Sequence, residues 1–111
     1  MRDGIRGVQG RFLALILGVG LVASASAATA AINGAAEFKE HCAACHANGG
    51  NLINPAKTLT KADREKHGIK TGKDLIRIMR KPGPGMTAFD EKTLPEKEAQ
   101  KIADYILKNF K

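Results

Sequence analysis

Large aromatic side chains are scarce in this chain of 111 residues, which has no tryptophan, one tyrosine and four phenylalanines. Such rings usually supply much of the apolar area that a core buries. We therefore expect a cofactor or another staple to fill part of the interior of so small a domain. The same scarcity argues against a nucleic-acid partner, because no aromatic platform accompanies the net charge of +7.

Long apolar runs and alternating patterns are also missing. The longest apolar run, Phe12 to Val22, has eleven residues, whereas a helix that spans a bilayer needs roughly 20. No stretch alternates apolar and polar residues for long, so the sequence carries no strand signal. These absences point away from a sheet-based fold.

The N-terminus has the layout of a secretory signal peptide. Three arginines precede the apolar run, and small residues with several A-x-A frames follow it. We expect a signal peptide at residues 1–27, cleaved near residues 27–30, and a mature domain at residues 28–111. The alternative is an uncleaved anchor. Such a signal peptide would direct export to the bacterial periplasm, and its cleavage would lower the net charge from +7 to +5.

Helical signals recur through the mature chain, so the expected fold class is all-α with about four short helices. The first covers residues 34 to about 46, and the second is a short helix that Thr60 and Asp63 cap and that ends at Gly68. The third covers residues 74–80 and follows a cap at Thr71. The last begins at Thr93 and has Pro95 in its first turn. The last helix should bury one stripe, Ala99, Ile102, Ala103, Ile106 and Phe110. Two loops stand out, at residues 48–59 and 81–86.

The only two cysteines lie in one pentapeptide, Cys42-Ala43-Ala44-Cys45-His46. Neither is near the cleavage region, which excludes bacterial lipid attachment there. Three kinds of chemistry compete for this motif: covalent haem attachment, a redox dithiol and part of a zinc site. A C-x-x-C-H motif indicates haem attachment, because two thiols at this spacing can reach both vinyl groups of one porphyrin. The histidine then faces the iron.

The other two uses fit less well. A redox dithiol follows a strand and starts a helix, whereas a helical segment precedes this motif. A zinc site needs four ligands. The candidates are Cys42, Cys45, His41 and either His46 or His67. No second C-x-x-C or H-x-x-x-H follows at finger spacing, and a disulfide across one helical turn would be too tight a ring. We therefore expect one covalent haem c on Cys42 and Cys45, with His46 as an axial ligand of its iron.

The second axial ligand should be a methionine, and Met79 and Met86 are the two that follow the leader. Met79 lies in an apolar helical pattern and is interpreted as core filler. Met86 follows Pro82-Gly83-Pro84-Gly85, a run that cannot form a helix interior and that would hold a thioether above the iron. His41 precedes the motif directly and cannot reach the far face. His67 is expected in solvent at a helix end.

With these residues in view, the chain resembles the class I cytochromes c, and among them the small c6-like group. The resemblance covers residues 34–110. The matching segments are Gly34–Phe38, Cys42–His46, Gly49–Asn51, Lys57–Leu59, Met86 with Ala88-Phe89, and Ile102–Tyr105. In this family the first helix packs against the last. The resemblance implies a small monomeric electron carrier that is not itself an enzyme and has no membrane span after cleavage.

Two positions depart from the family pattern. Many members have proline after the methionine, where this chain has Thr87. Photosynthetic members often have glutamine near the haem where this chain has Ile78, which argues against photosynthetic potentials. The Pro-Gly-rich loop before Met86 looks more like that of c6-like cytochromes from metal-reducing or anaerobic bacteria. The alternative function is a haem enzyme or ligand sensor with an open iron site.

The resemblance implies one-electron transfer between redox partner proteins. The residues expected to shield the iron from water are Leu52, Ile53, Leu59, Leu75, Ile78, Met79, Phe89 and Ile102. A basic surface favours partners with acidic docking surfaces. The residues expected to form a docking rim or to pair with the haem propionates are Lys70, Lys73, Arg77, Arg80 and Lys81.

Overall fold

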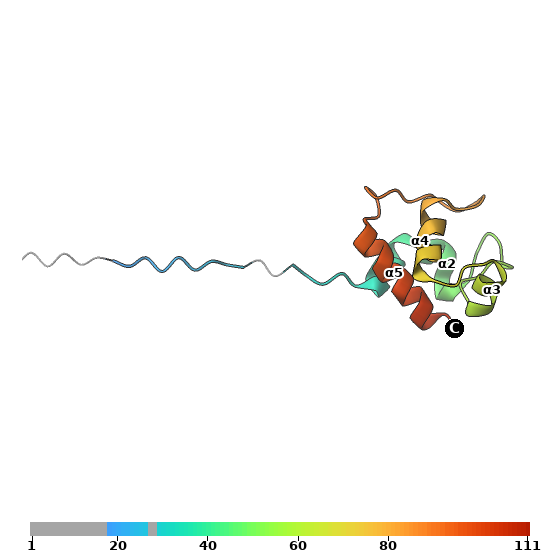
Figure 1. Cartoon of the computed structure of the whole chain (residues 1–111), viewed down its shortest axis with the longest axis horizontal. Helices are drawn as coiled ribbons and strands as arrows, with labels where there is room; N and C mark the ends of the chain where they lie inside the picture. The colour runs from blue at the N-terminus through green and yellow to red at the C-terminus, as the bar shows by residue number, and fades with distance from the viewer. Residues whose placement is uncertain (1–17, 27–28) are drawn as a thin grey trace, which may run out of the picture.

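The computed structural model describes residues 18–26 and 29–111, so most of the predicted signal peptide lies outside the described residues. Residues 18–26 and 29–33 form neither helix nor strand and lead into the folded part of the chain (Figure 1). Across these described ranges, no helix is both long enough and apolar enough to cross a membrane. Signal-peptide cleavage stays a prediction.

The described secondary structure is entirely helical, which confirms the expected all-α class. The elements are α1 (Gly34–His41), α2 (Ala43–His46), a 3-10 turn η1 (Ala47–Gly49), α3 (Lys61–Lys66), α4 (Gly72–Arg80) and α5 (Glu96–Asn109). Helix α5 packs against both α1 and α4. Helix α3 lies at the side of the folded part that is farthest from the N-terminal segment (Figure 1).

The helix expected at residues 34 to about 46 is two helices, because the backbone turns at Cys42. Asn33 caps α1, with its side-chain oxygen accepting two backbone amides at 3.0 and 3.2 Å. The Cys42 amide closes α1 by donating to the Phe38 carbonyl at 2.9 Å, and its carbonyl starts α2 by accepting from the His46 amide at 2.9 Å. Cys42 itself has φ −123° and ψ −34°. The second cysteine and the histidine therefore lie on a short helix of their own.

Thr60 and Thr71 precede α3 and α4 as predicted, but α4 begins at Gly72 rather than at Asp74. Thr71 and Asp74 form a reciprocal capping box, in which the Thr71 amide donates to the Asp74 carboxylate at 2.9 Å. These bonds, above all the one from the Thr71 hydroxyl, lower the pKa of Asp74. Thr60 precedes α3 as expected, but its side chain makes no capping bond to the helix. Gly68 follows the end of α3 with φ +73°.

The predicted start of α5 at Thr93 is wrong, since the helix begins at Glu96. The Leu94 amide donates to the Asp90 carbonyl at 2.9 Å, and the Thr93 amide donates to the Asp90 carboxylate at 2.7 Å. Thr93 is therefore part of a turn before the helix. That turn places Leu94 in the core, with 0% of its surface exposed, which the helical pattern of α5 did not indicate.

Helix α5 supplies half of the buried core. Its predicted stripe is confirmed for Ala99, Ile102, Ala103 and Ile106, all of which are buried. Phe110, which follows the helix, is half-buried. Its ring joins those of Phe38 and Tyr105 in an aromatic cluster with centroid separations of 5.1 to 5.8 Å.

Helix α1 meets α5 most closely at Gly34. A Cβ atom at Gly34 would collide with the carbonyl oxygen of Lys101 and would lie 3.3 Å from the Cβ of Tyr105. Any side chain here would push the two helix backbones apart. Glycine is therefore required at this position by the close approach, and the crossing holds the first turn of α1 against α5.

Arg64 is the one charged side chain that is buried in the described part of the chain, with 4% of its surface exposed. Its Nε donates to the carbonyl of Leu59 at 2.8 Å, and its Nη2 donates to the carbonyl of Phe110 at 3.1 Å. Helix α3 is thereby tied to the segment before it and to the end of the chain after α5. Burial of the guanidinium is offset by these charge-assisted bonds.

Replacing Gly34 by alanine should destabilise the fold because of the clash with Lys101. Helix propensity alone would favour alanine by roughly 0.5–1 kcal/mol. We expect the forced separation of α1 and α5 to outweigh that gain and to lower the free energy of unfolding by about 1–3 kcal/mol. Unfolding of the purified protein in denaturant measures the change.

Gly72→Ala is the matched control, since Gly72 also begins a helix that packs on α5. Its Cβ would lie 3.7 Å from the Cβ of Ala103, an ordinary contact, so we expect little change. Equal losses at both positions, or none at Gly34, would contradict the explanation by close approach.

Candidate functional site

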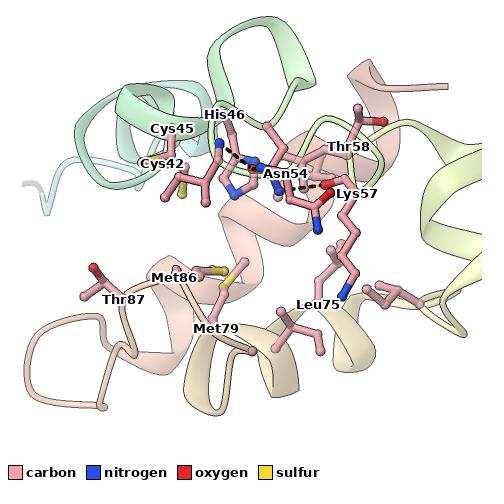
Figure 2. Close-up of a pocket in the computed structure, with 18 of the residues that line it drawn as sticks. Cys42, Cys45, His46, Asn54, Lys57, Thr58, Leu75, Met79, Met86 and Thr87 are labelled. Carbon is pink, nitrogen blue, oxygen red and sulfur yellow. Dashed lines mark hydrogen bonds between the residues drawn. The ribbon is translucent and has the colours of Figure 1, made fainter.

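A cavity of about 510 Å³ lies among α2, the loop that follows it, α4 and the loop that precedes α5. Its volume is within the range of about 300–1,000 Å³ that small-molecule and cofactor sites occupy. Figure 2 shows two facing walls, with Cys42, Cys45 and His46 on one and Met79 and Met86 on the other. The predicted site residues thus meet at one space although they come from separate segments.

The cysteine wall comes from α2 and the turn before it. Cys42 is half-buried, Cys45 is exposed, and both are free thiols. Burial raises the pKa of the Cys42 thiol to about 11, so this thiol is protonated near neutral pH. A redox dithiol works through a thiolate with a lowered pKa. The environment of Cys42 therefore argues against that use of the motif.

The imidazole of His46 is oriented by a hydrogen bond within its own turn. Its Nδ1 lies 2.7 Å from the carbonyl oxygen of Gly50. Because a carbonyl only accepts, the proton of the neutral ring is on Nδ1, which leaves the lone pair on Nε2. The bond depends on η1, where Asn48 (φ 54°) and Gly49 (φ 77°) adopt left-handed backbone and return the chain to the ring. This arrangement prepares Nε2 to ligate a metal.

The opposite wall carries two thioethers. Met79 lies on α4 with 4% of its surface exposed, and Met86 is half-buried in the loop between α4 and α5. Both sulfur atoms are directed toward the cysteine and histidine wall (Figure 2). The placement of Met79 in the core agrees with its predicted packing role, but its side chain also lines the cavity.

Known proteins match this chain closely. The family model described as cytochrome C oxidase, cbb3-type, subunit III covers residues 29–106. A cytochrome c6 of Nostoc is 36% identical over 100 residues, which span 86% of this chain and 89% of that protein. The chain belongs to the class I cytochromes c, as a c6-like member.

Solved structures of related cytochromes agree with this assignment. The outer membrane cytochrome F of Geobacter sulfurreducens has 46% sequence identity and a TM-score of 0.70, over 71% of this chain and 100% of that one. A cytochrome c6C of Synechococcus has 31% identity and a TM-score of 0.65, over 69% and 93% respectively. As a c-type cytochrome of this group, the protein carries one covalently bound haem c and is an electron carrier.

The side chains around the cavity of this cytochrome fit a haem. One wall offers two thiols and an imidazole nitrogen with a free lone pair, and the facing wall offers thioethers, which are soft, polarizable groups. Most of the remaining lining is apolar, which suits the porphyrin face. The predicted apolar residues that line the cavity are Ile53, Leu59, Leu75, Ile78, Met79 and Phe89.

Two residues of the predicted apolar shell are placed elsewhere. Leu52 has 77% of its surface exposed and is not part of the cavity lining, because the Asn51 side chain turns this segment outward. The side-chain oxygen of Asn51 accepts from the amides of Ile53 at 3.1 Å and Asn54 at 2.8 Å. Ile102 is fully buried between the helices, and Ile106, one turn further along α5, lines the cavity instead.

The remaining histidines, His41 and His67, also line the cavity. His41 points its Nε2 toward the Glu37 carboxylate at 3.5 Å and stands edge-on to the Phe89 ring at 6.0 Å. His67 is exposed at the end of α3, as expected. Among the described residues, the only group of three His, Cys, Asp or Glu side chains with metal-site spacing is Glu37, Glu40 and His41. It contains neither cysteine, so the zinc alternative lacks its geometry.

The basic residues at the cavity include two that sequence reasoning missed, Lys57 and Arg64. Lys57 belongs to the segment Lys57–Leu59 that carries the family resemblance, but neither residue was expected to line the cavity. Arg80 was expected on a docking rim, but its side chain is only 19% exposed and is engaged in hydrogen bonds to the protein. A docking role for Arg80 is therefore wrong.

The stability of this cytochrome should depend on pH through Asp63, which lines the cavity. Its carboxylate accepts from the Thr58 hydroxyl and from the Thr58 amide at 3.1 Å, and these bonds lower the pKa of Asp63 from 3.8. A depressed pKa gives stability that is complete above the unfolded pKa and is lost as the pH falls through the folded pKa. We expect Asp63→Asn to be less stable than the parent at pH 6, with the difference shrinking as the pH falls below 3.8 and through the lowered pKa of the folded protein.

Denaturant midpoints measured across that pH range check this expectation. Asp104→Asn, on the exposed face of α5, is the control and should follow the parent. If the profiles of Asp63→Asn and the parent run parallel down to the lowest pH, the Thr58 bonds do not stabilise the ionised carboxylate.

Proposed function

We propose that this cytochrome is a carrier exported to the bacterial periplasm and that its haem iron is held between His46 and Met86. One observation carries the proposal: an imidazole with an available Nε2 and a loop-borne thioether face each other across one largely apolar cavity (Figure 2). Cys42 and Cys45 would hold the haem covalently on the imidazole wall. When bound, the haem supplies an iron that alternates between the ferrous and ferric states.

The protein's part is to keep both axial side chains in place in either oxidation state. His46 is fixed by the bond from its Nδ1 to Gly50. Met86 sits in a loop that is stiffened by Pro82 and Pro84, whose backbone φ angles are restricted by their rings. An unchanged ligand set requires little rearrangement when an electron arrives or leaves, which is what a carrier needs.

Two observations support Met86 over Met79 as the axial ligand. Met79 is packed in the core with Leu75, and its helix packs against α5. Core packing therefore explains a methionine at this position without iron ligation. Met86 is half-buried in an irregular loop, where no helix packing explains a methionine. A thioether ligand raises the reduction potential of a haem. Ile78, which lines the same cavity, adds no polar group to it.

The charge of the protein favours acidic redox partners. Lys70, Lys73 and Lys81 are exposed near the two ends of α4, and after the proposed cleavage the net charge would be +5. Such a surface would attract partners with acidic docking surfaces, in weak and fast encounters that salt suppresses.

Met86→Ala should remove the second axial ligand and leave the fold in place. The ferric protein would lose its weak methionine-to-iron absorption band, the reduction potential would fall, and the ferrous protein would bind carbon monoxide. Met79→Ala, the matched control, should keep the spectrum and instead lower the free energy of unfolding by about 2–5 kcal/mol. Absorption spectra, redox titration and unfolding in denaturant separate the two effects.

A parent spectrum in Met86→Ala, or loss of the band in Met79→Ala, would show that the ligand is assigned to the wrong methionine. A high-spin spectrum in the parent would instead favour the enzyme or sensor with an open iron site.

The covalent link should be visible in the mass of the exported protein. Under denaturing conditions the parent should retain the mass of one haem, and the double variant C42A/C45A should lose it, because both thioether bonds are gone. The peptide mass also gives the N-terminus and so tests cleavage near residues 27–30. A folded, colourless product with the bare peptide mass would contradict covalent attachment.

A further inference from the structure

We propose that Arg80 is a positioning residue for the methionine loop, defined as residues 81–95, and that it keeps Met86 on the iron. The inference rests on the proposed ligation by Met86. Arg80 is the last residue of α4, directly before the loop begins. Its guanidinium reaches past the near end of the loop and binds the far end.

The guanidinium of Arg80 makes three hydrogen bonds. Nη1 donates to the carbonyl oxygen of Phe89 at 3.0 Å and to that of Leu94 at 2.8 Å. Nη2 donates to the Glu96 carboxylate at 3.1 Å. The side chain is 19% exposed, and its two bonds to carbonyl groups are partly buried, whereas the bond to Glu96 lies at the surface. Charge-assisted bonds in such a setting are stronger than neutral ones.

A backbone hydrogen bond also ties the loop to α4, at the first of these acceptor residues. The Phe89 amide donates to the carbonyl of Met79 at 2.9 Å. Both the amide and the carbonyl of Phe89 are therefore bonded to residues of α4. Met86 lies only three residues before that point. Together, the bond from the Phe89 amide to Met79 and the bonds of Arg80 hold the segment that carries the Met86 thioether against the end of α4.

The second acceptor anchors a rigid part of the loop. Leu94 is fully buried, and its turn is closed by the bond from its amide to the carbonyl of Asp90 at 2.9 Å. By holding the Leu94 carbonyl, Arg80 joins this turn to α4. Without the guanidinium, that carbonyl would lose its partner, and the loop would be tied to α4 only through Phe89.

Lysine could not replace this function fully. The three acceptors are arranged around a planar guanidinium, whose fork of donors reaches several acceptors at once, whereas an ammonium is a compact point charge. Arg77, on the same helix, provides the contrast. Its side chain is 63% exposed and pairs with Asp74 at 3.1 Å, outside the loop.

The test measures how readily Met86 leaves the iron. Imidazole is titrated against the ferric holoprotein, since this neutral probe can bind only when the methionine is displaced. Removing a set of charge-assisted bonds should raise the imidazole affinity of Arg80→Gln roughly tenfold to a hundredfold. Arg80→Lys should show a smaller increase, and Glu96→Gln, which leaves both carbonyl bonds in place, should show less than Arg80→Gln. Arg77→Gln should match the parent.

A second control separates loop opening from loss of global stability. Asn33→Ala removes the cap of α1, far from the loop in sequence, and should destabilise the protein without raising imidazole affinity. The proposal is overturned if Arg80→Gln and Arg80→Lys bind imidazole as weakly as the parent, or if Asn33→Ala opens the iron as much as Arg80→Gln does. A parent that is already high-spin and binds imidazole without displacing a ligand would overturn the ligation by Met86 itself.

Discussion

The contact between α1 and α5 at Gly34 is the constraint on which the site depends. Without a side chain at Gly34, the first turn of α1 rests against Lys101 and Tyr105 of α5, and the helix leads from this crossing to Cys42 and the turn into α2. The other face of α5 holds α4, which carries Met79 and leads into the methionine loop. Helix α5 is therefore the common reference for both walls of the cavity.

The two walls are stabilised in different ways. The histidine wall is local, because the orienting bond joins His46 and Gly50, four residues apart in one turn. The methionine wall depends on bonds between distant residues, from Arg80 to the carbonyls of Phe89 and Leu94. A local turn forms with little loss of chain entropy, whereas the loop must be closed over many residues. The thioether side is accordingly the one at which ligation can open without unfolding of the domain.

Local patterns predicted much of this molecule, and long-range contacts account for what they missed. The capping box of α4 and the buried stripe of α5 depend on residues within a turn or two, so they could be found in the sequence. The break at Cys42 could not, because neither glycine nor proline marks it. Thr93 was misjudged because the burial of Leu94, rather than a capping bond, decides where the chain enters α5.

The site showed the same division. The spacing of Cys42, Cys45 and His46 and the loop before Met86 indicated which residues would line one cavity. The roles of Arg64 and Arg80 could not be predicted, because each depends on carbonyl groups that only the folded backbone brings together. In a lysine-rich chain, an arginine is expected to be a solvated surface charge unless the carbonyl groups that accept its hydrogen bonds are known.

The edge-on contact between His41 and Phe89, which both line the cavity, joins the end of α1 directly to the methionine loop. Phe89 is also held by α4 through its backbone. The two halves of the haem pocket are thus connected by this ring contact as well as through the cofactor. A shift of the methionine loop would move the Phe89 ring against His41 and so affect the turn at Cys42. We therefore expect the two walls of the cavity to move together rather than to open about a hinge.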